Sequence, residues 1–280
     1  MGPGGRCGRG DHGCPAIIGR TAGTALAADW QTQRYIDAAA DPAKAGRIRR
    51  RVGGVTVGAD LVRLAIDPQL NAVRERRQAT FALLSADLAE LAVAGRIQVQ
   101  GGWLTERIVV TDPRPVGEQL LDRSLAALAA AKRPDSGDWV RQKLRSCVLE
   151  EYLSMLASRS EVLLYTRQAG GRFTRHPLTE ATLLGPGRAA RDQAIRRLAA
   201  YVANPPPRPT PSGLLEWAFA GLVFEGDLAT LFYAGRRHRD AYHRLRDAAR
   251  AQPGPGDGPA AAVIRSAIQA ARTGANEGSD

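Results

Sequence analysis

The sequence predicts a mainly α protein, with seven or more helices and two short β-hairpins. Hydrophobic residues make up 44% of the 280-residue chain, but aromatic residues make up only 5%. A core packed by Leu, Val, Ile and Ala favours helices over strands. Apolar residues also recur three and four positions apart in several long segments, which is the spacing of an amphipathic helix.

Helical patterns cover most of the chain after residue 54. The first lies in the segment GADLVRLAI, and a longer one ends at Gly95, a typical C-cap residue. The apolar stripe of the longer helix is formed by Phe81, Leu84, Leu88, Leu91 and Ala92. Further helices are expected at 117–131, 138–156, 188–202, 214–224, 236–250 and 260–271.

Two segments predict β-hairpins because β-branched and apolar residues flank glycine pairs. In the first, Ile97 and Val99 precede Gly101-Gly102, and 108–110 follows. The second spans 162–174 and turns at Gly170-Gly171, with strands at 162–165 and 172–174.

The N-terminal residues 1–54 differ in composition from the rest. They begin with MGPGGRCGRGDHG, which has no apolar period, and we expect a disordered basic extension. Residues 1–55 contain nine basic and four acidic residues, a net charge of +5. We expect the folded domain to cover 55–272 and the last residues, 273–280, to be frayed.

Charge indicates the class of partner. The chain has a formal net charge of +11, and all but three of its 39 basic residues are arginine. The planar guanidinium group matches phosphate oxygens two at a time, so a phosphate-bearing partner, lipid or nucleic acid, is expected. The most apolar stretch, Trp217–Phe224, has eight residues, whereas a membrane-spanning helix needs about 20.

Motifs typical of catalysis are weak. Gly185-Pro186-Gly187 with the following residues matches a dinucleotide-binding pattern, but a plain helix start explains it better. Asp87 and Glu90 are interpreted as a solvated helix face, since neither a base nor a nucleophile accompanies them. No metal-binding spacing or catalytic triad context is recognised. We therefore expect no enzyme activity, no cofactor and no metal.

The helix that ends at Gly95 and the hairpin after it also resemble a winged helix, which would bind nucleic acid through its basic face. A winged module has about 80 residues, and the helical pattern continues far beyond that length. Nucleic-acid binding is therefore kept as the alternative function.

Three segments resemble motifs of the Golgi phosphoprotein 3 family. They are AELAVAGRI at 89–97, DPRPVGEQLLD at 112–122 and TRHPLT at 174–179. In the second motif, Val116 stands where the family usually has Thr, and Glu118 where it has Asp. Order and spacing agree from about Gly58 to Ala271, and the second motif is the most specific of the three.

This resemblance implies one mainly helical domain with a central four-helix bundle and no catalysis. It further implies a peripheral membrane protein on the cytoplasmic face of a membrane, binding phosphatidylinositol 4-phosphate. In eukaryotes the family retains Golgi glycosyltransferases through their cytosolic tails, so an adaptor role with a protein cargo is also expected.

The family's lipid-binding side chains can be placed on this sequence. The position of its arginine is Leu84, the position of its tryptophan is Glu75, and an arginine pair maps near Arg145 and Val148. Cations nearby would form a substitute basic pocket for the headgroup. The expected headgroup-binding residues are Arg74, Arg76, Arg77, Arg141, Lys143 and Arg145.

The last prediction concerns the apolar residues of the second hairpin. By resemblance, its apolar residues insert into the membrane or pair with another subunit to form a homo-oligomer; the alternative is that they pack on the domain. These residues are Leu163, Leu164, Tyr165 and Phe173.

Overall fold

The computed structural model describes most of the chain after residue 55. The described ranges are 56–101, 106–131, 134–144, 147–169, 176–204, 211–233, 238–251 and 258–276. The expected disorder of 1–54 concerns residues outside these ranges and stays a prediction.

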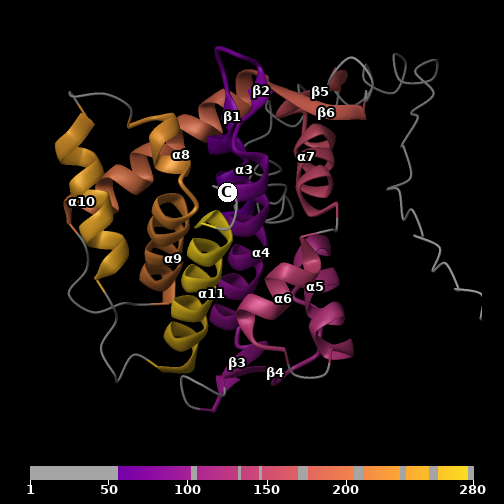
Figure 1. The fold of residues 1–280 in the computed structure, drawn as a ribbon, viewed down its shortest axis with the longest axis vertical. Coiled ribbons are helices and arrows are strands. Elements are labelled where there is room, and N and C mark those ends of the chain that lie inside the picture. The colour runs from indigo at the N-terminus through magenta and orange to yellow at the C-terminus, as the bar shows by residue number, and fades with distance from the viewer. Residues whose placement is uncertain are drawn as a thin grey trace, which may run out of the picture. The chain divides into compact units, whose positions relative to one another are not determined.

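Four helices form the core of the described domain. They are α3 (Val57–Ala65), α4 (Arg76–Val93), α9 (Pro211–Glu225) and α11 (Gly258–Asn276). Helix α4 packs against each of the other three, and Figure 1 shows it near the middle of the view. The mainly α, single-domain fold is thus confirmed.

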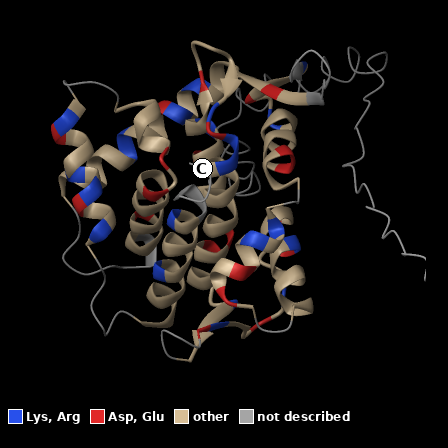
Figure 2. Cartoon of the chain, viewed as in Figure 1, with Lys and Arg blue, Asp and Glu red and all other residues tan. Residues whose placement is uncertain are grey.

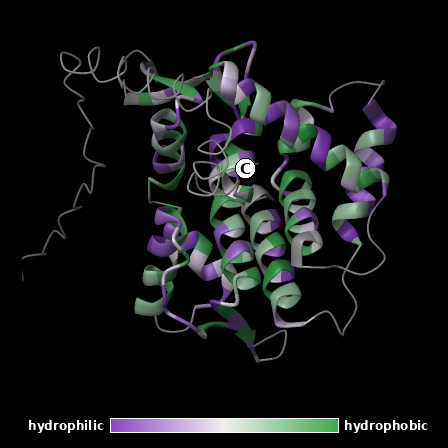
Figure 3. Ribbon diagram, turned by 180° about the vertical axis from the view of Figure 1, so that it is seen from behind, coloured by the Kyte–Doolittle hydropathy of each residue, from purple (hydrophilic) through white to green (hydrophobic). Residues whose placement is uncertain are grey.

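The core helices carry apolar residues on more than one face, and these residues are buried. The predicted stripe of α4 is entirely buried, and so are Leu83, Ala86 and Ala89 on its other sides. In α9, Ala218, Phe219 and Leu222 are completely buried, and the core helices are mostly green in the hydropathy view of Figure 3. Helices that are apolar nearly all round must be surrounded by other helices.

Helices α5 (Gln119–Ala130), α6 (Ser136–Lys143) and α7 (Val148–Ser158) pack against α4. The single helix expected at 138–156 is wrong, because the chain forms α6 and α7 separately. The break allows α6 to pack against α11 while α7 packs against α3 and the following strand. The side chain of Asp135 caps α6 by accepting a hydrogen bond from the backbone N–H of Asp138.

The remaining helices are α8 (Gly185–Ala203), α10 (Arg239–Arg250) and a short 3₁₀ helix, Leu228–Leu231. The predicted helix start at Gly185-Pro186-Gly187 is confirmed, with Pro in the first turn of α8. A side chain at Gly187 would clash with the carbonyl oxygen of Glu161, so close packing explains this glycine. Helix α11 continues to Asn276, into the segment expected to be frayed.

Three antiparallel strand pairs occur within the described ranges. The pair β3 (Ile97–Gln100) and β4 (Arg107–Val110) is the first predicted hairpin. The pair β5 (Val162–Ala169) and β6 (His176–Leu183) is the second. The second strand was expected at 172–174 but lies at 176–183. Val162 pairs with Leu183, so both strands are longer than the strands expected from the position of the glycine pair.

A further pair, β1 (Ile66–Asp67) and β2 (Ala72–Val73), was not predicted. Two residues per strand are too few to show an alternating pattern. The Asp67 side chain stabilises the turn by accepting hydrogen bonds from the backbone N–H groups of Gln69 and Leu70.

Candidate headgroup pocket

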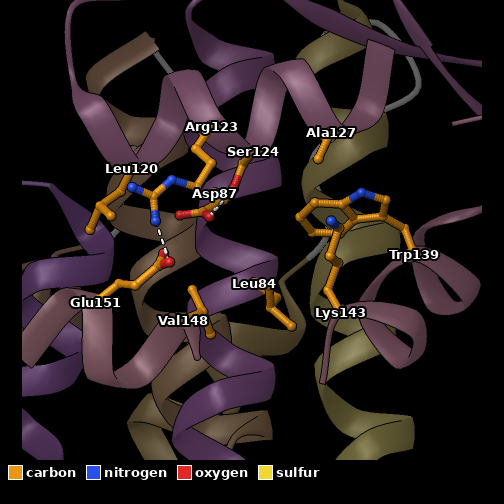
Figure 4. Close-up of a pocket in the computed structure, with 10 residues that line it drawn as sticks. All are labelled: Leu84, Asp87, Leu120, Arg123, Ser124, Ala127, Trp139, Lys143, Val148 and Glu151. Carbon is orange, nitrogen blue, oxygen red and sulfur yellow. Dashed lines mark hydrogen bonds and ion pairs between the residues drawn. The ribbon is translucent and has the colours of Figure 1, made fainter. Parts of the chain in front are cut away.

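A small pocket lies among α4, α5, α6 and α7 (Figure 4). Its volume is about 80 Å³. Its apolar lining consists of Leu84, Leu120, Ala127, Trp139 and Val148. Its polar lining consists of Asp87, Arg123, Ser124, Lys143 and Glu151. Each helix contributes residues three or four positions apart, which lie on one helical face.

Asp87 is completely buried beside the pocket. One carboxylate oxygen accepts a hydrogen bond from the Tyr152 hydroxyl at 2.7 Å, and the other accepts one from Ser124 Oγ at 2.6 Å. Burial raises the pKa of Asp87 to about 6, although the two hydrogen bonds favour the ionised form. The carboxylate therefore joins α4 to α5 and α7.

Glu90 has a related structural role on the same helix. Its carboxylate accepts a hydrogen bond from the backbone N–H of Gly58 at 3.1 Å, at the N-terminus of α3. Burial raises its pKa to about 8, against the effect of this hydrogen bond. The interpretation of Asp87 and Glu90 as a solvated face is wrong, because α3, α5 and α7 cover the side of α4 that carries them.

Two cations among the described residues line the pocket. Arg123 on α5 forms an ion pair with Glu151 on α7. Lys143 lies in the last turn of α6, four positions after Trp139, and Figure 4 shows both among the residues that line the pocket. Of the five predicted headgroup-binding residues that the structure describes, Lys143 is the one that lines this pocket.

The other predicted cations have separate interactions. Arg74 lies 3.7 Å from Asp67, and Arg141 pairs with Asp138 at 2.6 Å. Figure 2 shows basic residues distributed over several helices and interspersed with acidic residues.

Arg76 contacts Glu150 at 2.9 Å and donates to the carbonyl oxygen of Thr179 at 2.8 Å, so it fixes α4 against α7 and β6. The guanidinium group of Arg77 lies 5.8 Å from the centre of the Phe81 ring. Arg145 falls outside the described residues. The structure therefore does not gather the six cations into one pocket, and their binding of lipid stays a prediction.

The sequence did not single out Arg123 and Trp139 as pocket residues. A usable signal exists for Arg123, because it follows Leu120 by three positions in a helix that starts within the second family-like motif. For Trp139 no comparable signal exists, since its position depends on the unpredicted break between α6 and α7.

The predicted hairpin residues lie in different environments. Leu163 and Tyr165, on one face of β5, are 58% and 39% exposed. Leu164 packs against the core, and Phe173 is outside the described residues. The Tyr165 hydroxyl donates a hydrogen bond to the carbonyl oxygen of Asn71, next to Leu70, which is 59% exposed. Insertion or subunit pairing through these residues stays a prediction.

Residues of the family-like motifs hold one another in place. Arg96, from the first motif, pairs with Asp112 from the second. Within the second motif, the Asp122 carboxylate accepts hydrogen bonds from the backbone N–H groups of Val116 and Gly117. These contacts fix the chain between β4 and α5, the helix that carries Arg123 to the pocket.

Fold and pocket together define a mainly α, single-domain protein with a small mixed polar and apolar pocket in its helical bundle. Throughout the described part of the chain, no helix is both long and apolar enough to cross a membrane. Those same ranges contain no group of three or more potential metal ligands.

The chain belongs to the Golgi phosphoprotein 3 (GPP34) family, whose sequence model matches residues 57–271. The match covers α3, α4, α9 and all four pocket helices, and α11 as far as residue 271. No curated protein matches the chain in sequence.

Proposed function

We propose that this protein is a non-enzymatic peripheral membrane protein that binds anionic lipid headgroups in the pocket among α4–α7. Family membership supports this function, because the resemblance implies binding of phosphatidylinositol 4-phosphate and an adaptor role toward a protein cargo. The single observation that carries the proposal is the position of the pocket. It is lined by Leu84 and Val148, at or near the positions of lipid-binding arginines in the family.

The cations of the proposed site come from α5 and α6. Arg123 and Lys143 would contact the phosphate group. Arg123 would give up its ion pair with Glu151 to make this contact. The pocket volume of about 80 Å³ accommodates a phosphate group more readily than a complete inositol ring. We therefore propose that the site selects negative charge more strongly than headgroup structure.

The exposed apolar residues near the β1–β2 turn support a membrane-facing role. Leu163 and Tyr165 on β5, together with Leu70, present side chains that can enter the interfacial region of a bilayer. Phosphate contacts and shallow apolar insertion together give firmer binding than either does alone. The cytoplasmic face of a membrane is the proposed location.

Vesicle sedimentation tests the pocket. The variant R123Q/K143Q removes both pocket cations, and R239Q/R244Q removes two exposed arginines of α10 as a control with the same change in charge. We expect the first variant to lose binding to phosphatidylglycerol vesicles several-fold and the second to retain it. Equal losses would show diffuse electrostatic attraction in place of a site, and unchanged binding by R123Q/K143Q would reject the pocket. Melting temperatures of both variants confirm folding.

A further inference from the structure

A second cleft lies among α9, α10 and α11, and its volume is about 420 Å³. This volume is in the range of small-molecule sites, which span roughly 300–1,000 Å³. The cleft shares no lining residue with the headgroup pocket. Its main residues are Trp217, Glu225, Arg250, Arg265, Ile268 and Arg272.

The cleft has an excess of positive charge. Among the described residues, three guanidinium groups line it, from Arg250 on α10 and from Arg265 and Arg272 on α11, against the single carboxylate of Glu225. Arg272 Nε lies 3.7 Å from a Glu225 carboxylate oxygen, a distance that leaves its donors available to a ligand. Guanidinium groups present planar pairs of donors that match the oxygens of phosphate and carboxylate.

Trp217 adds a neutral donor to the residues that line the cleft. Its side chain is 3% exposed, and its Nε1–H group is buried without a hydrogen-bond partner among the described residues. A buried donor without a partner is unfavourable, so such a group is normally satisfied by water or by a ligand. An anionic oxygen in the cleft would provide the acceptor.

Apolar surface lies beside these polar groups. Ile268 lines the cleft, and its side chain packs against Gly221, where an added Cβ atom would clash with it. Arg250 is held over the Phe224 ring, with its guanidinium carbon 5.6 Å from the ring centre. A wall of this kind favours a ligand that carries an apolar group next to its charge.

We infer that this cleft is a second ligand site, which binds a small phosphate monoester with an apolar substituent. The arginines bind the phosphate oxygens, the Trp217 indole N–H donates to one of them, and Ile268 contacts the apolar part. The same chemistry occurs in lysophosphatidic acid and in a soluble organic phosphate, so the experiment includes both sources. The site is independent of the proposed headgroup pocket.

The test is a titration followed by the indole N–H resonances in a ¹⁵N-labelled sample of the full chain. The W217F variant identifies the Trp217 signal, since the chain contains four tryptophans. Hexyl phosphate is the soluble probe, inorganic phosphate tests charge alone, and hexanol tests the apolar part alone. Lysophosphatidic acid in phosphatidylcholine vesicles represents the lipid source.

We expect a saturable shift of the Trp217 signal with hexyl phosphate. The affinities for inorganic phosphate alone and for hexanol alone should be at least about tenfold weaker, a difference of about 1.4 kcal/mol in binding free energy. The variant R250Q/R272Q should weaken hexyl phosphate binding by a similar factor, whereas R239Q/R244Q should not. If R250Q/R272Q responds like the wild type, or if all four indole signals move together, the inference is wrong. A response to the lipid vesicles but not to hexyl phosphate would also overturn it, in favour of surface adsorption.

Failure of this inference is distinguishable from failure of the proposed function. Vesicle binding by R250Q/R272Q is expected to equal that of R239Q/R244Q, because the headgroup pocket is intact in both. The hexyl phosphate response is likewise expected to persist in R123Q/K143Q.

Discussion

The partly buried carboxyl group of Glu90 makes the stability of the domain depend on pH. Its pKa is raised from 4.5 to about 8 by burial. At low pH the group is protonated in both the folded and the unfolded state. As pH rises above 4.5, the unfolded chain releases its proton first, so the free energy of unfolding falls until the folded state also ionises near pH 8.

The size of this effect follows from the two pKa values. One pKa unit corresponds to about 1.4 kcal/mol, so Glu90 should lower the free energy of unfolding by about 3 kcal/mol between about pH 5 and about pH 8. In E90Q the amide cannot ionise but can still accept the hydrogen bond from the backbone N–H of Gly58. The variant should therefore gain stability relative to the wild type as pH rises.

Urea unfolding of both proteins at these two pH values measures the difference. Asp87 contributes its own pH dependence in both proteins, and its negative charge adds to the raised pKa of Glu90. The control is E118Q, which changes a side chain that is 28% exposed and 3.8 Å from Arg159. A constant stability difference between E90Q and the wild type across this range would refute the assignment of a raised pKa to Glu90.

Two further predictions concern packing and charge in the core. G187A should destabilise the domain by about 1–3 kcal/mol, because the new Cβ atom meets the Glu161 carbonyl oxygen, whereas G185A has no neighbour within 4 Å and should cost nothing. Thermal unfolding compares them, and equal melting temperatures would contradict the close approach. R63M should cost about 3–5 kcal/mol, because the Arg63 guanidinium group bonds to Asp60 at 2.6 Å and to Glu161 at 2.7 Å. The control variant R114M changes a side chain that is 81% exposed and should change the free energy of unfolding by less than about 1 kcal/mol. Similar urea midpoints for R63M and R114M would disprove a structural role for Arg63.

The helical core could be predicted because its signal is local. The stripe from Phe81 to Ala92 repeats at the helical period, and every member is buried. The break between α6 and α7 could not be predicted, because neither Gly nor Pro occurs in the sequence from 144 to 148. What separates the two helices is packing against different partners, α11 for one and α3 for the other.

Polar residues inside the core were harder to predict than the apolar ones. Asp87 resembles a surface residue until its partners are known, and these are Ser124 and Tyr152, which lie 37 and 65 positions further along the chain. Arginines were equally ambiguous: the sequence shows the cluster of Arg74, Arg76 and Arg77 but not the carboxylates that pair with two of them. Long-range partners of this kind are set by the tertiary fold.

The central claim, that anionic headgroups recruit this protein to a membrane, is tested most directly by sedimentation of the wild-type chain with vesicles at about 0.15 M salt. We predict strong recruitment by vesicles containing phosphatidylinositol 4-phosphate, similar recruitment by phosphatidylglycerol vesicles of equal charge, and little by pure phosphatidylcholine. Recruitment to neutral vesicles that equals recruitment to both charged kinds would contradict the claim.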